Sequence, residues 1–493
     1  MSKLETGEII GSHDSQKKLN KYACDTGVMS GAMLFIKEEF TIKEGQVEVL
    51  AGILNLCALA GSLLAGRTSD HIGRRYTISL AAAIFMLGSI LMGYSPSYSV
   101  LLAGRCTAGL GVGFALMIAP VYAAEISSAH TRGFLSSLPE IGISIGILLG
   151  YISNNLFANL SLRLGWRLML GIAAVPSLLL GIGILKMPES PRWLIARGRV
   201  REAKEILYKV CDETDEAERR LREIKKAAGI DENCNDDFVR IDVKRGAGEG
   251  ETGIWRDLLF KPSPTVRRML VAGVGVHFFE HATGTEAVIL YGPKIFRKAG
   301  VTARRKLLLA TVGVGLTKLT FITISTFIID KVGRRKLLLV SIAGMAVALT
   351  GLGTCLTVVE RAEEARLVWA LVMSLIFVYM FLAFFNIGLC PVCWVYSSEI
   401  FPTRLRAAGA SVSVGVNRVM NATVSMTFLS LSSAITIGGA FYLFASVAGV
   451  AWVFVYFCLP ETKGKSLEEM EEVFSKGMCS SNKANKQVEL VNT

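Results

Sequence analysis

Two oppositely charged residues, of which the acid could bind and release a proton, lie inside apolar stretches of this sequence. Asp25 is near the start of the stretch 22–36, and Arg105 lies within the stretch 98–123. A charge at the centre of a bilayer costs roughly 3 kcal/mol or more, so each ionisable residue there is a functional candidate. If the two helices pack together, protonation of Asp25 would release Arg105, which gives a switch set by a proton gradient. A permanent structural ion pair is the alternative.

A second group of polar side chains lies on the apolar stretch 265–291. His277, Glu280, His281 and Gly284 have the spacing of one helical face, and Glu286 is nearby. Convergent donors and acceptors with an aromatic ring suit an uncharged ligand rich in hydroxyl groups, although a plain helix–helix hydrogen bond is the alternative for each residue. A metal site at Glu280 and His281 is not expected, because no further His or Cys is clustered with them. Other apolar stretches contribute the candidate ligand residues Glu140, Lys318, Asn386, Trp394, Asn417 and Asn421.

The elements that must position these residues are membrane helices. The chain has 493 residues, 52% of them hydrophobic, and a mean hydropathy of +0.46, which is typical of a multi-pass membrane protein. The first stretch has only 15 residues, about 22 Å as a helix, against a hydrocarbon core of about 30 Å. The expected spans, six on either side of a polar insert, are 22–36, 47–66, 76–94, 98–123, 135–158, 165–186, 265–291, 306–329, 337–358, 366–396, 406–431 and 435–457.

The net charge of +12 comes largely from basic residues in short loops. Membrane topology and anionic lipid explain this charge better than a nucleic-acid partner does, and both termini are expected in the cytosol. The loop 294–306 is an exception, because it would be external although it is basic and carries no acid. Ten scattered cysteines predict no disulfide framework, and no redox role is expected for Cys390 and Cys393 inside an apolar stretch.

The two sets of stretches repeat one another. The segment GRTSDHIGRR at 66–75 returns as DKVGRR at 330–335, and Gly73 and Gly333 can adopt the positive φ that a tight turn needs. Duplicated halves place a binding site between them, reached alternately from each side. Ion pairs among the charged residues of the repeat could close the cytosolic side, or the charges could merely fix the topology. These gate candidates are Asp70, Arg74, Arg75, Glu125, Arg132, Asp330, Arg334, Arg335, Glu399 and Arg406.

The insert sets the predicted domain organisation. Residues 1–21 form a cytosolic segment without a cleavable signal, 22–186 the N-terminal half, 187–264 a cytosolic helical linker, 265–458 the C-terminal half and 459–493 a cytosolic tail. Within the linker, apolar residues at 200, 203, 207 and 210 and again at 217, 221, 224 and 228 have helical spacing. This spacing predicts short amphipathic helices.

Several motifs together resemble the sugar porter family of the major facilitator superfamily over about residues 22–470. They are the two GRR turns, Gly104-Arg105, PESPR at 188–192, WVYSSE at 394–399, Arg404 with Arg406, and PET at 460–462. The stretch 47–53, Pro139-Glu140, Lys318 and the stretch 434–440 resemble the plant-type polyol/monosaccharide proton symporters in particular.

This resemblance implies a fold of twelve transmembrane helices in two six-helix halves. It also implies that Asp25 and Arg105 form the proton-coupling pair, and that a sugar site is lined by Glu140, residues 280, 281 and 286, Trp394 and Asn417. The chain departs from the family where Glu280 and His281 replace paired glutamines, where Cys390 replaces a glycine, and in its short first helix.

We therefore expect a monomeric proton symporter of polyols or monosaccharides in the plasma membrane. The proton is expected to be the coupling ion, with no cofactor, no metal and no nucleic-acid partner. An uncoupled facilitator or exchanger of the same fold, a non-transporting sensor and a decayed copy are the alternatives. No set of catalytic residues in the sequence indicates an enzyme.

Overall fold

The protein is described by a computed structural model that covers residues 26–126, 132–211, 214–227, 256–361, 368–401, 405–463, 470 and 473–474. Within these ranges the regular secondary structure is helical throughout, without strands. Nine helical segments of the described part are long and apolar enough to cross a membrane. The predicted all-helical, multi-pass architecture is confirmed.

The helices of the first half follow the predicted apolar stretches closely. The described part of the first helix covers 26–40 and precedes α2, so this helix ends later than the predicted 22–36. The others are α2 (Glu44–Ile72), α3 (Arg74–Tyr94), α4 (Tyr98–Ile126), α5 (Arg132–Phe157), α6 (Leu162–Gly171) and α7 (Ala174–Leu185).

The insert and the second half continue the series. The insert contains α8 (Pro191–Ala196), α9 (Val200–Val210), α10 (Thr214–Ala227) and the π-helical turn η2 (Arg256–Phe260). The second half contains α12 (Pro264–Ala282), α13 (Thr285–Lys298), α14 (Arg304–Val332), α15 (Arg334–Arg361), α16 (Val368–Ile387), α17 (Leu389–Glu399), α18 (Arg406–Ile435) and α19 (Ile437–Cys458).

Three of the predicted spans are each divided into two helices in the structure. The break at 283–284 separates α12 from α13, and Gly284 adopts a φ of 84° there, which favours glycine. Gly284 therefore lies at the break and not on the helical face predicted for it. The other breaks separate α6 from α7 at 172–173 and α16 from α17 at Gly388. Gly73 and Gly333, with φ of 95° and 98°, form the two predicted GRR turns.

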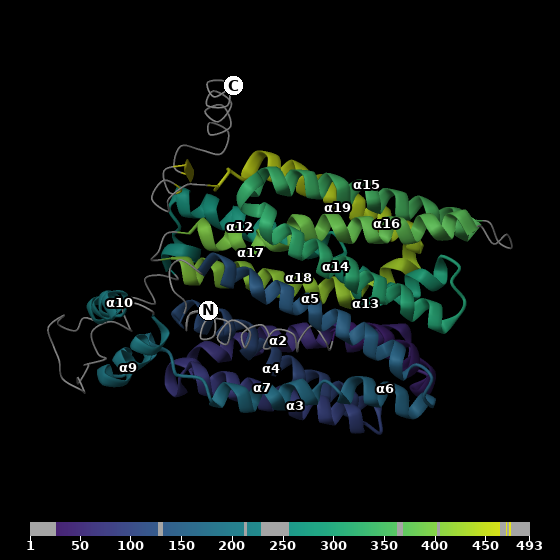
Figure 1. The fold of residues 1–493 in the computed structure, drawn as a ribbon. Coiled ribbons are helices and arrows are strands. Elements are labelled where there is room, and N and C mark those ends of the chain that lie inside the picture. The colour runs from purple at the N-terminus through teal and green to yellow at the C-terminus, as the bar shows by residue number, and fades with distance from the viewer. Residues whose placement is uncertain are drawn as a thin grey trace. The chain divides into compact units, whose positions relative to one another are not determined.

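The residues group into two contact units. Unit 1 includes Leu56–Ile147 and Trp166–Ala247, and unit 2 includes Thr26–Asn55, Leu148–Gly165 and Gly248–Thr493. In unit 1, α3 lies beside α4 and α7 (Figure 1). In unit 2, α15 lies beside α16 and α19, and α12 lies beside α18 (Figure 1). The domain boundaries at residues 186 and 264 stay a prediction.

The insert helices bury the apolar faces that their spacing predicted. Val200, Ala203 and Leu207 of α9 pack with Ala217 and Leu221 of α10 in one cluster, which α8 completes. The opposite faces of α9 and α10 carry charged, exposed residues. The predicted amphipathic helices are confirmed.

Glycine allows α4 to approach α2 closely in unit 1. A Cβ atom at Gly113 would lie 2.1 Å from the carbonyl oxygen of Ala58, and one at Gly61 would lie 2.5 Å from that of Leu110. Small residues at such crossings are characteristic of packing between membrane helices, because backbones can then meet directly.

Replacing Gly113 by alanine is therefore expected to lower the stability of the folded protein by about 1–3 kcal/mol, because the added methyl group meets backbone that cannot rotate away. Gly449→Ala in α19 is the control, since nothing lies within 4 Å of its added Cβ. That variant should be neutral or gain up to about 1 kcal/mol from helix propensity. Thermal melting of the purified, detergent-solubilised chain measures both, and equal melting temperatures would contradict the packing argument.

Candidate functional site

The polar residues of α12 are buried in unit 2 and face α18. His277, Glu280 and His281 are all at most 5% exposed, although they belong to a helix of a membrane protein. Burial of such groups is tolerated only where other polar groups bond to them. Asn417 and Asn421 of α18, which are also buried, supply these partners.

The first cluster joins three side chains near the end of α12. The His277 Nδ1 lies 3.3 Å from Glu280 Oε2, and Asn417 Nδ2 donates to the same carboxylate oxygen at 2.6 Å. The Asn417 Nδ2 also lies 3.2 Å from His277 Nδ1. Trp394 of α17 presents its ring to the His277 ring in an edge-on arrangement, with centroids 5.2 Å apart.

The second cluster forms across the break at Gly284. Glu286 of α13 has its Oε1 3.6 Å from His281 Nδ1, and Asn421 Nδ2 donates to this oxygen at 2.7 Å. Asn421 Oδ1 accepts a hydrogen bond of 2.6 Å from Asn55 Nδ2 of α2. Asn55 was not predicted as a site residue, although a single asparagine in the apolar run 50–60 was a signal that could have found it.

Several polar atoms of these clusters have no hydrogen-bond partner among the described residues. They include the Nε2 atoms of His277 and His281 and the Oδ1 of Asn417, all buried. A buried donor or acceptor without a partner costs about 1–3 kcal/mol, which a ligand hydroxyl group at these positions would recover. The arrangement can therefore bind a molecule that both donates and accepts hydrogen bonds.

The structure does not bring every predicted ligand residue into these clusters. Lys318 is buried on α14, and the Asn386 amide donates to the carbonyl of Leu382 in its own helix. Glu140 is half-buried in unit 1, and Arg105, also in unit 1, is 2% exposed. Asp25 lies outside the described residues, so the Asp25–Arg105 pair stays a prediction.

Both GRR turns carry ion pairs of the kind that the repeat suggested. In unit 1, Arg74 Nε lies 3.2 Å from Glu125 Oε2, and its Nη1 lies 3.1 Å from Asp70 Oδ1. In unit 2, Arg334 Nη2 lies 2.9 Å from Glu399 Oε1. Both acids also accept hydroxyl hydrogen bonds, Glu125 from Ser190 and Glu399 from Thr462.

These ion pairs join residues of the same half. Arg75 and Arg335 instead donate to backbone carbonyls, those of Met187 and Tyr456. The side chains of Arg132, Asp330 and Arg406 lie outside the described part of the structure. The role of the whole set as a gate stays a prediction.

Two further acids, which sequence reasoning did not assign to a role, cap the helices after the GRR turns. Glu189 Oε1 accepts from the backbone N–H groups of Arg74 and Arg75 at 2.9 and 3.1 Å. Glu461 does the same for Arg334 and Arg335 at 2.8 and 3.0 Å. A carboxylate at a helix N-terminus satisfies free amides and complements the helix dipole.

Replacing Glu189 by alanine is expected to cost about 1–2 kcal/mol of stability, because α3 loses the acceptor of its first two amides. Glu202→Ala is the matched control: Glu202 pairs with Arg199 on the half-exposed surface of α9, where an ion pair contributes about 0–1 kcal/mol. The two melting temperatures should differ, with Glu189→Ala the lower. A larger loss in the Glu202 variant would show that the cap is unimportant.

The basic loop that violated the topology rule finds acidic partners within unit 2. Lys294 Nζ lies 2.6 Å from Glu44 Oε1, and Arg304 Nη2 lies 2.6 Å from Glu38 Oε1. Deeper in the same region, Glu48 accepts from the backbone N–H of Ser430 at 2.7 Å and from its hydroxyl group. We call Glu38, Glu44, Glu48, Lys294, Arg304 and Ser430 the end cluster. It lies at the end of α14 opposite Gly333 and joins α2 to α13 and α18.

Comparison with known proteins identifies the family. Residues 21–474 match the family model described as "Sugar (and other) transporter". The chain belongs to this sugar transporter family. It is 64% identical to "Probable polyol transporter 6" and 54% identical to "Polyol transporter 5" of Arabidopsis thaliana. The matches cover 92% of this chain in both cases, and 92% and 83% of those relatives.

The fold agrees with solved structures of the same superfamily. The proton:xylose symporter XylE, bound to 6-bromo-6-deoxy-D-glucose, superposes with a TM-score of 0.76 at 26% identity, covering 96% of this chain and all of that one. An inward-open structure of XylE from E. coli gives a TM-score of 0.74 at 26% identity, covering 94% and 98%. The predicted major facilitator fold of twelve helices is confirmed, and this sugar transporter is not an enzyme.

Apolarity alone recognises nine spans among the described residues, fewer than the twelve helices of this fold. The described part of the first helix covers only 26–40, the α12–α13 pair is broken and carries charged residues, and α18 carries asparagine and serine. Of these segments, α12, α13 and α18 hold both His–Glu–Asn clusters.

Proposed function

We propose that this transporter is a proton symporter of linear polyols and monosaccharides. The observation that carries the proposal is the pair of buried clusters His277–Glu280–Asn417 and His281–Glu286–Asn421. Each offers donors and acceptors on facing helices, which suits vicinal hydroxyl groups. The aromatic ring of Trp394, placed against His277, would cover the carbon chain of the solute.

The names of similar proteins support the same substrate class. The Arabidopsis relatives are named polyol transporters, and XylE is described as a proton:xylose symporter. Substrates of both kinds are uncharged and hydroxyl-rich. In this chain Glu280 and His281 replace the paired glutamines that sugar porters usually carry. Glu280 would be a stronger hydrogen-bond acceptor for a hydroxyl group, and His281 can both donate and accept.

Coupling to protons is assigned to Asp25 and Arg105. Arg105 is almost completely buried in α4, where an unpaired charge would be costly, so a carboxylate that gains and loses a proton is a suitable partner. Solute and proton would then move together through alternating access. We place the protein in the plasma membrane as a monomer, which a fluorescent fusion and size-exclusion chromatography with light scattering would test.

The test is uptake of labelled sorbitol by a transport-deficient yeast that expresses the chain, together with the pH of the unbuffered medium. We expect accumulation above the external concentration and alkalinisation on addition of sorbitol. Asp25→Asn should abolish both while leaving exchange of labelled for unlabelled sorbitol. Asp215→Asn on the exposed face of α10 is the matched control and should behave as the unmodified chain.

Each result decides between the alternatives. Uptake that only equilibrates, without alkalinisation, would show an uncoupled facilitator. Accumulation by Asp25→Asn would show that the coupling role is wrong. No movement of sorbitol, xylose or other polyols by a correctly inserted chain would overturn the proposed function and favour a non-transporting sensor or a decayed copy.

A further inference from the structure

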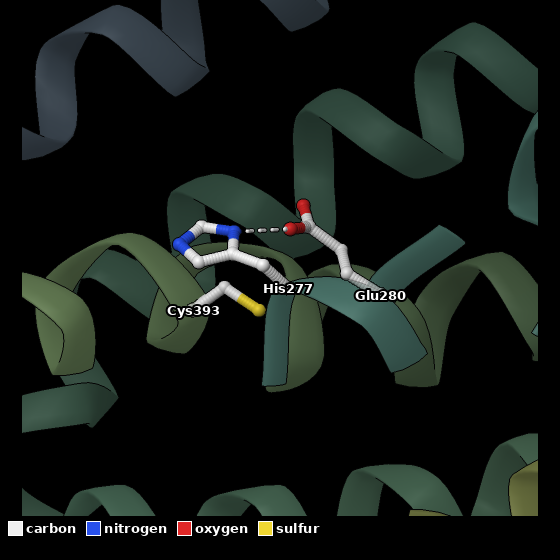
Figure 2. A group of neighbouring side chains, drawn as sticks. All are labelled: His277, Glu280 and Cys393. Atoms are coloured by element: carbon white, nitrogen blue, oxygen red, sulfur yellow. Dashed lines mark hydrogen bonds and ion pairs between the residues drawn. The ribbon is translucent and has the colours of Figure 1, made fainter. Parts of the chain in front are cut away.

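A cysteine joins the first buried cluster of the site. Cys393 of α17 extends its thiol toward His277 and Glu280 of α12, and the three side chains converge on one small region (Figure 2). Their ligand atoms, a ring nitrogen, a carboxylate oxygen and a sulfur, all lie within 4.8 Å of one another, and all three residues are buried. Spacing along the chain does not predict this convergence, because Cys393 lies more than 100 residues after Glu280.

We propose that His277, Glu280 and Cys393 form a binding site for a divalent cation of the zinc class. Imidazole nitrogen, thiolate and carboxylate are the three donor types that zinc accepts in proteins. Magnesium and calcium bind through oxygen atoms alone, so a set with sulfur and nitrogen disfavours them. The expected ions are therefore Zn²⁺ and its spectroscopic substitutes Co²⁺ and Cd²⁺.

The spacing of the donors is close to what a tetrahedral ion requires. Metal–ligand bonds of about 2.0–2.3 Å place neighbouring ligand atoms roughly 3.5 Å apart. His277 Nδ1 and Glu280 Oε2 are 3.3 Å apart. The Cys393 Sγ lies 3.5 Å from the carbonyl oxygen of Val276 and within 4.8 Å of both other ligand atoms, so binding of an ion would require the sulfur to move closer to them.

A fourth donor is already beside the site. The Asn417 amide nitrogen contacts both Glu280 Oε2 and His277 Nδ1, while its Oδ1 is buried without a partner among the described residues. Rotation of the amide by half a turn would aim this oxygen at the ion. The edge of Trp394 packs on the His277 ring and would limit its movement.

The charges near the cluster also accommodate a dication. Glu280 interacts electrostatically with His277, His281 and Arg418, and His281 interacts with Glu286. When the ion binds, the Cys393 thiol releases its proton to solvent and becomes a thiolate. One thiolate and two carboxylates then balance the dication and the Arg418 guanidinium, with both histidines neutral. A neutral total is what a buried site needs.

A bound ion would also occupy Glu280 and Asn417, the groups assigned above to the solute. It should therefore compete with polyols and inhibit uptake. This consequence rests on the proposed function, whereas binding of the ion does not.

The test uses the full chain, purified in detergent, treated with a chelator and titrated with Co²⁺. We expect one equivalent to produce the near-ultraviolet absorption of a cobalt–thiolate bond and to raise the melting temperature. Cys393→Thr should lose both, and His277→Gln should weaken binding at least about ten-fold. The matched controls are Cys390→Thr, one turn earlier on α17, and His281→Gln in the second cluster, which should both bind as the unmodified chain does.

The outcomes separate the site from the proposed function. A Cys393→Thr protein that melts normally without metal and still gives the cobalt–thiolate band would overturn the proposed metal site. The proposal would also be overturned if the unmodified chain showed no saturable binding of Co²⁺. Cobalt binding that Cys393→Thr abolishes, in a chain that moves no polyol, would support the site and contradict the proposed function. Inhibition of sorbitol uptake by Cd²⁺, lost in Cys393→Thr and kept in Cys390→Thr, would support both.

Discussion

Replacing Asn417 by leucine is expected to lower sorbitol uptake at limiting substrate by roughly 30- to 150-fold. The Asn417 amide is the group that joins α18 to the first cluster, through its hydrogen bond of 2.6 Å to Glu280. Loss of a hydrogen bond to a charged group costs about 2–3 kcal/mol at the upper end of the observed range, and each 1.4 kcal/mol is ten-fold in affinity. Leucine has a similar size, so the change removes polar atoms with little change in volume.

Asn386→Leu is the matched control for this experiment. Asn386 is also a buried asparagine of the second half, but its amide bonds to the carbonyl of Leu382 in its own helix. Uptake by Asn386→Leu should fall by less than about three-fold, because an intrahelical hydrogen bond contributes only about 0.5 kcal/mol at the lower end of the range. Uptake is normalised to the amount of chain at the cell surface. Equal losses in the two variants would mean that α18 does not supply the polyol ligands.

Replacing Glu48 by alanine is expected to open the end cluster. The rate at which a thiol reagent modifies a cysteine at position 51 should then rise by roughly ten-fold or more. Glu48 is buried and holds both the amide and the hydroxyl group of Ser430 on α18. Alternating access requires helices of the two halves to separate at this end during each cycle. Removing bonds to a buried charge, worth about 1.5–3 kcal/mol, should therefore shift the population toward the open form.

The measurement is the rate at which a membrane-impermeant thiol reagent modifies Ala51→Cys, followed by mass spectrometry of the peptide that contains it. Ala51 is 2% exposed on α2, so in the structure it is shielded. Thr427→Ala is the control, because the Thr427 hydroxyl bonds only to the Thr423 carbonyl of its own helix. If Glu48→Ala and Thr427→Ala are modified at the same slow rate, the end cluster does not control opening.

The local elements of this transporter were readable from its sequence because their causes are local. Long apolar stretches free of breaks predict membrane helices, and the polar residues at the GRR turns predict where α3 and α15 begin. Ion pairs among the charged residues of the repeat were one of two interpretations, and the structure pairs Arg74 with Glu125 and Arg334 with Glu399. The residues of the buried clusters on α12 and α18 were also selected correctly as polar groups on apolar helices, although their binding role is untested.

The partners of these residues depend on tertiary structure. Asn55 lies more than 360 residues before Asn421, and Lys294 lies 250 residues after Glu44. No periodicity connects positions so far apart, since helical spacing relates only residues three or four apart. This is why the basic loop looked like an exception to the topology rule, whereas in the structure two of its charges are paired.

The sequence by itself therefore determined the helices, the repeat and the types of residue at the site. Tertiary structure alone decided that a left-handed glycine at 284 breaks the seventh span and brings Glu286 to His281, and that α17 brings Cys393 to His277. The physical reason is that helix formation depends on neighbours along the chain, whereas a site depends on which faces of different helices pack together, and many packings share the same pattern of apolar residues.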